Sequence, residues 1–239
     1  MAGHVLDNPI WASLSSLHRG LALGTGGALR YPGDIAPFLG FVGSGPIDRK
    51  ALESLFGPGE TLYLIGPEPS VPGSWELVDL GRLVQMVCEA PLPEVEGPEI
   101  VPLTGPHRAA VLALTALVYP HYFRSRTMEL GRYFGMFDRG HLAAMIGERM
   151  GTPGFREVSA VCTHPDFIGR GYARRLLAFL TNDILQHADT PFLHVSPLNE
   201  RARALYEQNG YRTRSMVPFW SLGRATKETI SAQSGRRGS

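Results

Sequence analysis

The sequence predicts an α/β protein in which short strands alternate with helices. One observation behind this prediction is an amphipathic helix that follows Gly169 and extends to about residue 187, whose apolar side chains recur at helical spacing. Strand-like runs precede and follow that helix, at residues 157–163 and 192–196. A third observation is the Asp-Arg-Gly turn between the runs 133–137 and 141–149, which is typical of a hairpin. With 239 residues, 44% of them hydrophobic, the chain is long enough for one large or two small domains.

The first half of the chain is predicted to consist of short elements separated by Gly and Pro turns. A helix begins at Pro9 with Asn8 as its N-cap, because Pro is favoured at the first helical position. A second short helix is expected at residues 47–56, where Gly-Pro-Gly ends it. The expected strands are 21–23, 28–31, 36–42, 61–65 and 83–88.

The second half shows clearer periodicity. In addition to the elements above, it is expected to contain a strand at 100–103, a helix from Gly105, a helix at 199–209 and a strand at 211–222. A segment rich in proline and glutamate, residues 91–98, separates the two halves and is typical of a linker. We therefore expect a domain boundary near Gly97, with domains at 1–97 and 98–223, and a disordered polar tail at 224–239.

Charge and composition exclude several classes of function. The chain has 23 Lys and Arg against 22 Asp and Glu, a net charge of +1, so general binding to nucleic acid or an anionic membrane is not expected. The two cysteines, Cys88 and Cys162, lie in apolar runs and are expected to be reduced and buried, without a metal. No apolar run reaches the ~20 residues that span a bilayer. The first residues do not resemble a signal peptide, so a cytoplasmic location is expected.

The turn before this predicted helix is a candidate phosphate-binding site. Gly169 and Gly171 permit close approach of the backbone to a ligand, and the first turn of a helix carries free N–H groups. Arg170, Arg174 and Arg175 crowd this positive end of the helix dipole, where cations are unfavourable unless an anion pairs with them. A Walker loop is absent, and a dinucleotide fingerprint would lack its third glycine.

Two segments together resemble the GNAT superfamily of acyl-CoA-dependent N-acyltransferases. Ile168-Gly-Arg-Gly-Tyr-Ala173 is similar to the family's pyrophosphate motif, with Ile168 in place of the usual Gln or Arg. The segment from Asn199 to Tyr211 is similar to its companion motif, Asn-x-x-Ala-x-x-Leu-Tyr-x-x-x-Gly-Phe/Tyr. Less specific features resemble the glycine N-acyltransferase-like C-terminal domain, namely Arg126-Thr-x-x-Leu-Gly131, Gly147-Glu-Arg149 and Val161-Cys-Thr-His-Pro165.

The resemblance implies a central mixed, mostly antiparallel sheet flanked by helices, with a smaller N-terminal α/β domain. It also implies direct transfer of an acyl group, acetyl in the simplest case, from acyl-CoA to an amine. Tyr206 would then be the general acid for the thiolate, and Glu157 the first choice for general base, with Glu148 and His121 as rivals. Strand alternation would place Glu157, Ser159 and Val161 on one face. The residues implied to bind acyl-CoA are Val161, Cys162, Thr163, Gly169, Arg170, Gly171, Tyr172, Ala173, Arg174 and Asn199.

The acceptor is expected to be a small-molecule amine bound between residues 121–127 and the hairpin 133–148. Tyr122, Arg126 and Glu148 would line that site, and Arg126 could hold a carboxylate. The N-terminal half is expected to shape the acceptor side or a homodimer contact. Two alternatives remain open at this point: a GNAT fold that binds acyl-CoA without turnover, as a sensor or interaction module, and a protein that binds another nucleotide.

Overall fold

The computed structural model describes residues 3–25, 27–43, 45–118 and 120–225. Two sheets lie in this part of the chain, one small and one large. The small sheet pairs β1 (Ala28–Arg30) with β2 (Leu39–Phe41). The large sheet contains β3 (Thr61–Ile65), β4 (Trp75–Val87), β5 (Val101–Pro102), β6 (Tyr133–Asp138), β7 (His141–Thr152), β8 (Phe155–Thr163), β9 (Thr190–Val195) and β10 (Arg212–Arg224). The helices used below are α1 (Pro9–Leu14), α2 (Arg49–Leu55), α3 (Arg108–Val118), α4 (Tyr172–Gln186) and α5 (Glu200–Gln208), with the 3₁₀ turns η4 (Thr127–Leu130) and η5 (Pro165–Phe167).

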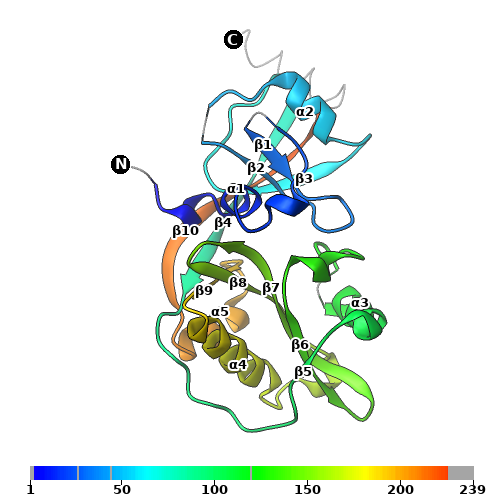
Figure 1. Cartoon of the computed structure of the whole chain (residues 1–239), viewed down its shortest axis with the longest axis vertical. Coiled ribbons are helices and arrows are strands. Elements are labelled where there is room, and N and C mark those ends of the chain that lie inside the picture. The colour runs from blue at the N-terminus through cyan, green and yellow to red at the C-terminus, as the bar shows by residue number, and fades with distance from the viewer. Residues whose placement is uncertain (1–2, 26, 44, 119, 226–239) are drawn as a thin grey trace.

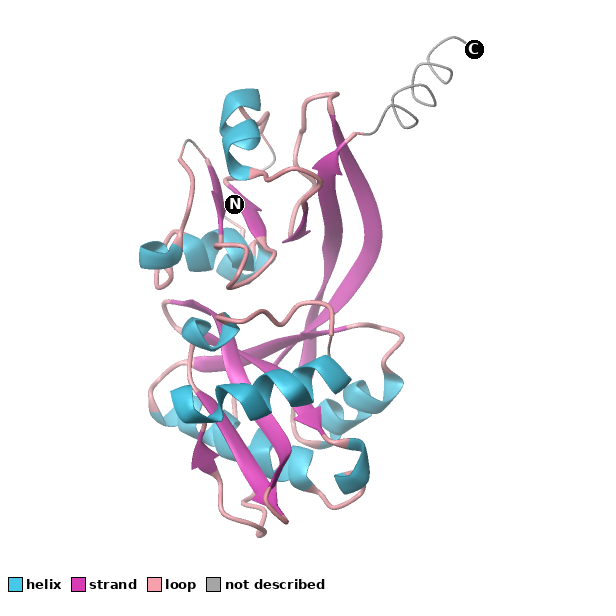
Figure 2. Ribbon diagram, turned by 90° about the vertical axis from the view of Figure 1, so that its right-hand side faces the viewer, coloured by secondary structure: helices cyan, strands magenta, loops and turns pink. Residues whose placement is uncertain are grey.

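The strand order of the large sheet is β3-β10-β4-β9-β8-β7-β6-β5. All neighbouring strands are antiparallel except β8 and β9, which are parallel. Helices flank this sheet, as Figures 1 and 2 show. The predicted fold class, a mostly antiparallel sheet flanked by helices, is therefore confirmed.

Helices α4 and α3 cover opposite faces of the sheet. The apolar stripe of α4, which includes Leu176 and Leu180, is fully buried against a cluster that contains Ile146 of β7. Its neighbour Met145 belongs instead to a cluster with Val111 of α3. Because successive side chains of a strand point to opposite faces, the two helices lie on the two sides of β7. The periodicity read from the sequence thus identifies the buried stripe of α4 correctly.

The N-terminal half contributes strands to the same sheet as the C-terminal half. β4 lies between β9 and β10, and β3 forms the edge beyond β10. Figures 1 and 2 show the long strands β4 and β10 running from the lower part of the molecule to the part that carries β1, β2 and α2. The boundary expected near Gly97 falls in the connection between β4 and β5. The first half is therefore joined to the second through a shared sheet, and not only by packing.

Several elements differ from the sequence-based expectation. Residues 19–21 form a 3₁₀ turn where a strand was expected to begin, and Leu23 makes only an isolated bridge to Arg30. β4 begins at Trp75, well before the expected residue 83, because its middle is exposed and carries no apolar signal. Asn8 precedes α1 as predicted, but its side chain donates to the Phe41 carbonyl at 2.6 Å and does not cap the helix. Of the expected tail, Arg224 ends β10, while residues 226–239 lie outside the described residues.

Both cysteines are free and buried in this structure. Within the described ranges, every helix is too short or too polar to cross a membrane.

Candidate functional site

Strands β8 and β9 separate part-way along the sheet. Residues 155–157 of β8 pair with residues 190–192 of β9, whereas β8 itself continues to Thr163. Over that second part the described strand that pairs with β8 is β7, on its other edge. The backbone on the β9 side of β8 is therefore open to a ligand, and it lies where the two parallel strands diverge.

A β-bulge interrupts β8 at the same place. Cys162 pairs with Met145 and Ser159 with Gly147, so Ala160 and Val161 together oppose Ile146. Ala160 adopts a φ of 50°, which is uncommon for a residue with a Cβ. The bulge reverses the alternation: Val158 and Val161 both pack on the α4 side, whereas Ala160 and Cys162 pack on the α3 side. The expectation that Glu157, Ser159 and Val161 share one face is therefore wrong beyond Ser159.

A cavity of about 450 Å³ opens where the strands separate. It is bounded by the end of β8, the loop from η5 into α4, the end of α3 and one side of α5. Nine of the residues predicted from the sequence line it together: Val161, Thr163, Gly169, Gly171, Tyr172, Ala173, Arg174, Asn199 and Tyr206. The lining that sequence reasoning missed consists of Val118, Phe167, Ile168, Arg201, Ala202 and Leu205.

The loop into α4 presents backbone N–H groups to this cavity. Gly169 and Gly171 adopt φ values of 85° and 78°, and a Cβ at either position would meet no atom within 4 Å. Glycine is therefore required at these two positions by the backbone conformation, and not because a side chain would lack space. No side chain caps α4 at its N-cap residue, Gly171. The N–H groups of the first turn, together with the helix dipole, make this a suitable site for an anion.

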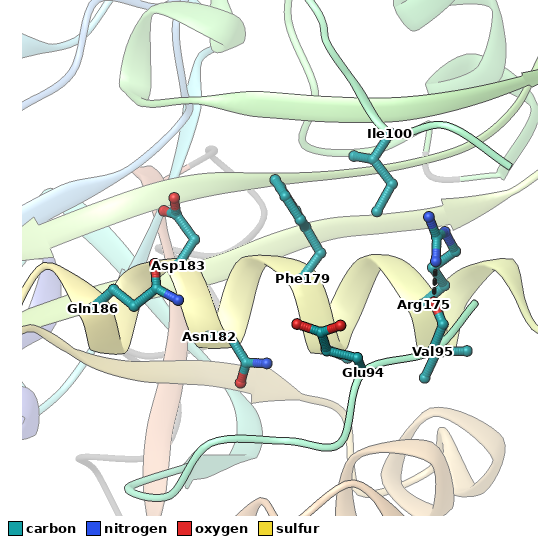
Figure 3. A pocket seen from close by; sticks show the side chains of 9 residues that line it. Glu94, Val95, Ile100, Arg175, Phe179, Asn182, Asp183 and Gln186 are labelled. Atoms are coloured by element: carbon teal, nitrogen blue, oxygen red, sulfur yellow. Dashed lines mark hydrogen bonds between the residues drawn. The ribbon is translucent and has the colours of Figure 1, made fainter. Parts of the chain in front are cut away.

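Of the three arginines expected at this site, Arg170 and Arg175 have separate partners, and only Arg174 lines the cavity. Arg170 donates to Asp138 at 2.7 Å and lies over the ring of Phe167. Arg175 donates to the carbonyls of Val95 and Pro98. These two hydrogen bonds hold residues 91–98 against α4. Figure 3 shows this on the outer side of α4, where Arg175 points toward Val95 beside a second cavity. The structure therefore does not bring all three arginines to one anion-binding site.

Arg201 is a second cation at the cavity, and the sequence-based prediction missed it. It belongs to the first turn of α5, two residues after Asn199, whose side chain caps that helix by accepting from the Ala202 N–H at 3.1 Å. The sequence does contain a signal for Arg201. A residue that caps a helix lies beside the first turn of that helix, so a cap at Asn199 in the site places Arg201 near the site as well. Arg174 and Arg201 therefore give the cavity its positive charge from two different helices.

Tyr206 lies further along α5 and closes the cavity on the side of the sheet. It is almost completely buried, and its ring centroid lies 6.0 Å from that of Tyr211. Cys162, in contrast, turns its thiol away from the cavity into the α3-side core. Burial raises the pKa of that thiol to about 12, so the side chain stays protonated and packs as an apolar group.

Glu157 lies in a buried ion pair and does not line the cavity. Its side chain is fully buried; Arg149 donates to both carboxylate oxygens, at 2.8 and 2.6 Å, and the Met150 N–H donates at 3.2 Å. His194 Nδ1 lies 2.7 Å from Oε1. Burial raises the pKa of this carboxyl, but the charge and hydrogen bonds of Arg149 and His194 outweigh burial and lower it to about 2. The geometry therefore argues against the base role expected of Glu157.

The hydrogen-bond network around Glu157 assigns the His194 tautomer. Arg214 can only donate, so the Gln85 oxygen accepts from it and the Gln85 NH₂ group faces His194 Nε2, at 2.9 Å. The same NH₂ group donates to the Leu6 carbonyl at 2.8 Å. His194 therefore accepts at Nε2 and donates from Nδ1 to Glu157. This network joins the N-terminal segment to the centre of the sheet.

A narrow pocket lies on the other side of the bulge. Its lining combines the N-terminal half, the loop after α3, η4 and the strands β6 to β8, as follows: Ala36, Phe38, Tyr122, Phe123, Thr127, Leu130, Tyr133, Arg149, Ser159 and Ala160. Ser159 and Ala160 border this pocket, while the next residue, Val161, borders the larger cavity. Neighbouring residues of the bulge thus line the two spaces. We call the narrow one the bulge pocket.

Of the three residues expected to bind the acceptor, only Tyr122 lines the bulge pocket. Arg126 is exposed and is paired with Asp34 at 3.0 Å and with Glu129 at 2.6 Å. Glu148 is buried and accepts from Arg132 at 2.6 Å. Both charges are used in structural ion pairs, which spacing in the sequence does not reveal.

The N-terminal half is held against this pocket by backbone contacts. The Arg126 N–H donates to the Asp34 carbonyl at 2.9 Å, and the Thr127 hydroxyl donates to the Ile35 carbonyl at 2.6 Å. Ala36 and Phe38 follow directly and form one wall.

Comparison with known proteins decides the family. The FR47-like protein family matches residues 133–220. A solved structure of a putative acetyltransferase of the GNAT family from Novosphingobium aromaticivorans DSM 12444 is 32% identical, with a TM-score of 0.84, over 94% of this chain and 100% of that chain. This chain belongs to the GNAT family. A GCN5-related N-acetyltransferase from Kribbella flavida shares the fold at 17% identity, with a TM-score of 0.61, over 92% of this chain and 95% of that one. A search of curated proteins gave no match.

The cavity of this GNAT protein fits the co-substrate of its family. GNAT acetyltransferases use acetyl-CoA, whose pyrophosphate requires N–H donors and cations, and both are present at the first turn of α4 with Arg174 and Arg201. The open edge of β8 can pair with the amide groups of the pantetheine arm. Among the described residues, no group of three or more His, Cys, Asp or Glu is placed to hold a metal ion.

Proposed function

We propose that this protein transfers an acyl group, acetyl in the simplest case, from a CoA thioester to the amine of a small molecule. The observation that carries the proposal is that neighbouring residues of the β8 bulge line two separate spaces. One space has the features of a CoA site, and the other is a separate pocket on the opposite side. A thioester held in the first space would present its carbonyl carbon to an amine in the second. Such positioning of two reactants supplies much of the rate of a bimolecular reaction.

The reaction forms a C–N bond, breaks the C–S bond, and moves one proton from nitrogen to sulfur. Of the two candidate donors, Cys162 and Thr163, the backbone N–H of Thr163 is on the open edge of β8 and would stabilise the oxyanion of the tetrahedral intermediate, because the Cys162 N–H points toward β7. Tyr206, which lines the cavity, would donate a proton to the departing thiolate. The chain's own residues thus supply the acid and the oxyanion donor.

The N-terminal half would shape the acceptor side of this site. Ala36 and Phe38 form a wall of the bulge pocket, and the contacts of residues 34 and 35 with the loop before η4 hold that wall in place. This supports the acceptor-side role expected of residues 1–97. The similarity of the motifs to the glycine N-acyltransferase-like subgroup stays a prediction.

Two measurements on the full chain test the proposal. In a thermal-shift assay, acetyl-CoA and CoA should raise the melting temperature, while ATP and NAD should not; protection by ATP or NAD alone would favour the nucleotide-binding alternative. In a thioester-cleavage assay, a panel of primary amines should release CoA from acetyl-CoA. Protection by acetyl-CoA without cleavage on any amine would contradict the transferase proposal and favour the non-catalytic module.

The site itself is checked by the variant Arg174→Glu, with Arg170→Glu as the matched control. Arg174 lines the cavity, whereas Arg170 is engaged with Asp138. Charge reversal at Arg174 should weaken acetyl-CoA binding at least about tenfold, because a charge-assisted contact to phosphate is worth roughly 1.5–3 kcal/mol. Reversal at Arg170 should change binding less. The opposite order of effects would place the pyrophosphate elsewhere.

A further inference from the structure

The bulge pocket, the proposed acceptor site, is lined by a cation and by no carboxylate among the described residues. Its ionisable side chains, among the described lining residues, are Arg149, Tyr122 and Tyr133. No carboxylate and no imidazole belong to that lining. Tyr133 is fully enclosed, and burial raises its pKa above the usual value, so its phenol stays protonated. The described lining therefore contains a cation and weak acids, but no group that accepts a proton near neutral pH.

Arg149 lies between the pocket and the nearest carboxylate. Arg149 lines the pocket, and its guanidinium lies over the ring of another lining residue, Phe38, 5.0 Å from the ring centre. Its other side holds Glu157, both of whose oxygens already accept two hydrogen bonds each. The positive end of this ion pair thus faces the pocket. An ammonium group brought there would lose its water beside a guanidinium and gain no carboxylate.

The free space in the bulge pocket is small. The pocket has room for about 10 Å³, which is close to the volume that one water molecule needs. An NH₂ group is of similar size, so the amine nitrogen of the proposed acceptor can occupy this space. The charge pattern of the pocket then acts directly on the protonation state of that nitrogen.

We infer that the acceptor is a weakly basic amine, which enters the bulge pocket uncharged near neutral pH, with aromatic amines as the representative class. The inference rests on the proposed acyl transfer. The proton balance agrees with it: a neutral amine loses one proton as the C–N bond forms, and the departing sulfur takes one up. A protonated aliphatic amine would have to lose an additional proton first, and the described lining holds no group to accept it.

The first test is the pH dependence of kcat/KM for acetyl transfer by the full chain to aniline and to benzylamine. With aniline, which is neutral above about pH 6, we expect a flat profile from pH 6.5 to 9. With benzylamine we expect a rise of about tenfold per pH unit up to the pKa of the amine itself, because only the neutral form reacts. A benzylamine profile that levels off well below that pKa would reveal an enzyme base and overturn the inference.

The second test adds a carboxylate to the pocket and uses an uncharged control of the same size. Ser159→Asp should raise the ratio of kcat/KM for benzylamine to that for aniline at least about tenfold, because the new carboxylate can bind the ammonium and also accept its additional proton. Ser159→Asn should leave the ratio within about threefold. Equal ratios in the two variants, with acetyl-CoA protection retained in both, would overturn the inference.

Different outcomes contradict the proposed acyl transfer and the inferred class of acceptor. If acetyl-CoA is cleaved with benzylamine but the pH profile of kcat/KM levels off well below the pKa of the amine, the inference is wrong. The proposed acyl transfer still stands in that case. Absence of cleavage with every amine, despite protection by acetyl-CoA, removes the proposed function and the inference with it. If Ser159→Asp does not fold, the pH profiles of the unmodified chain still decide the matter.

Discussion

Tyr206 is the residue whose position in the cavity fits delivery of a proton to the CoA thiolate. A phenol with a usual pKa of about 10 is a weak acid toward a thiolate whose thiol titrates near 8.5, so the proton moves as the C–S bond breaks and not before. In the proposed reaction the residue would act through its hydroxyl group. Its ring contributes to the core around α5.

Tyr206→Phe is therefore expected to lower kcat for acetyl transfer about 100-fold and to leave acetyl-CoA binding unchanged. Tyr211→Phe is the matched control, because Tyr211 bonds to Thr181 at 2.7 Å in the core and does not line the cavity. That variant should lose about 1 kcal/mol of stability and retain its kcat. A kcat of Tyr206→Phe within about twofold of the unmodified chain would show that the hydroxyl is not the acid.

Glu157 is expected to contribute to stability and not to proton transfer. The pKa of its carboxyl is lowered from 4.5 to about 2 in the fold, so the unfolded chain binds the proton more tightly. The stabilisation is therefore complete above pH 4.5 and is lost as the pH falls from there toward 2. Urea unfolding between pH 7 and pH 3 should show this loss, and Glu157→Gln should remove that part of the pH dependence.

Glu157→Gln should also destabilise the protein by about 3–5 kcal/mol at pH 7, because the guanidinium of Arg149 loses its buried carboxylate partner. Glu53→Gln provides the control, since the exposed pair of Glu53 with Arg49 should contribute less than about 1 kcal/mol. A Glu157→Gln protein with normal stability and abolished acetyl transfer would instead support the base role.

At the scale of single elements, the bulge in β8 determines the geometry of the site. It turns Val161 toward the cavity and leaves Ser159 and Ala160 at the bulge pocket. The positive φ of Ala160 places a Cβ in a backbone region that costs roughly 1–2 kcal/mol. The strain is located where the two substrates would meet, as is common at functional sites.

Substitutions at Ala160 test whether that strain is real. Ala160→Gly should change the free energy of unfolding by less than about 1 kcal/mol, because relief of the strained φ offsets the entropy lost by glycine. Ala160→Val should cost more than about 2 kcal/mol, since a branched side chain at positive φ adds a steric clash. Chemical denaturation of both variants measures the difference. Equal stability of the two variants would argue against a strained bulge.

Elements differ in how well the sequence predicts them. β3 was predicted with its observed bounds, residues 61–65, because its apolar run is flanked by turn residues on both sides. β4 was found only at its last five residues, since its exposed middle shows no buried face. The bulge at Ala160 cannot be predicted from the local sequence. Nothing in Val-Ser-Ala-Val-Cys indicates that two residues of β8 lie opposite a single residue of β7. Register depends on the partner strand, which is distant in sequence.

At the scale of the whole molecule, the two halves are held together by one sheet and by a strapped connection. β4 supplies the neighbour of β9 and of β10, so the second half without β4 would expose the edges of both strands. The connection at residues 91–98 is held to α4 by Arg175 and by Asn182, which bonds the Leu92 N–H and carbonyl at 2.7 and 2.9 Å. Figure 3 shows Glu94 and Val95 lying along that helix.

A protease site inserted between Glu96 and Gly97 tests this arrangement. After cleavage, the two fragments should still co-elute in size-exclusion chromatography and keep their protection by acetyl-CoA, because the sheet holds them together. Residues 98–239 expressed alone should be largely unfolded by circular dichroism. A fragment 98–239 that folds and binds acetyl-CoA by itself would show that the first half is an independent domain.

The sequence by itself determined the parts of this protein that depend on near neighbours. The buried stripe of α4, the left-handed glycines of its N-terminal turn, the cap at Asn199 and the position of Tyr206 all follow from spacing within about 20 residues, and they suffice for the family. Only the tertiary structure decided the bulge in β8, the insertion of β4 between β9 and β10, and the pairing of Arg170, Arg175, Arg126, Glu148 and Glu157. The reason is physical. A charge's partner and a strand's register are set by residues brought together from distant parts of the chain, and a local pattern contains no information about them.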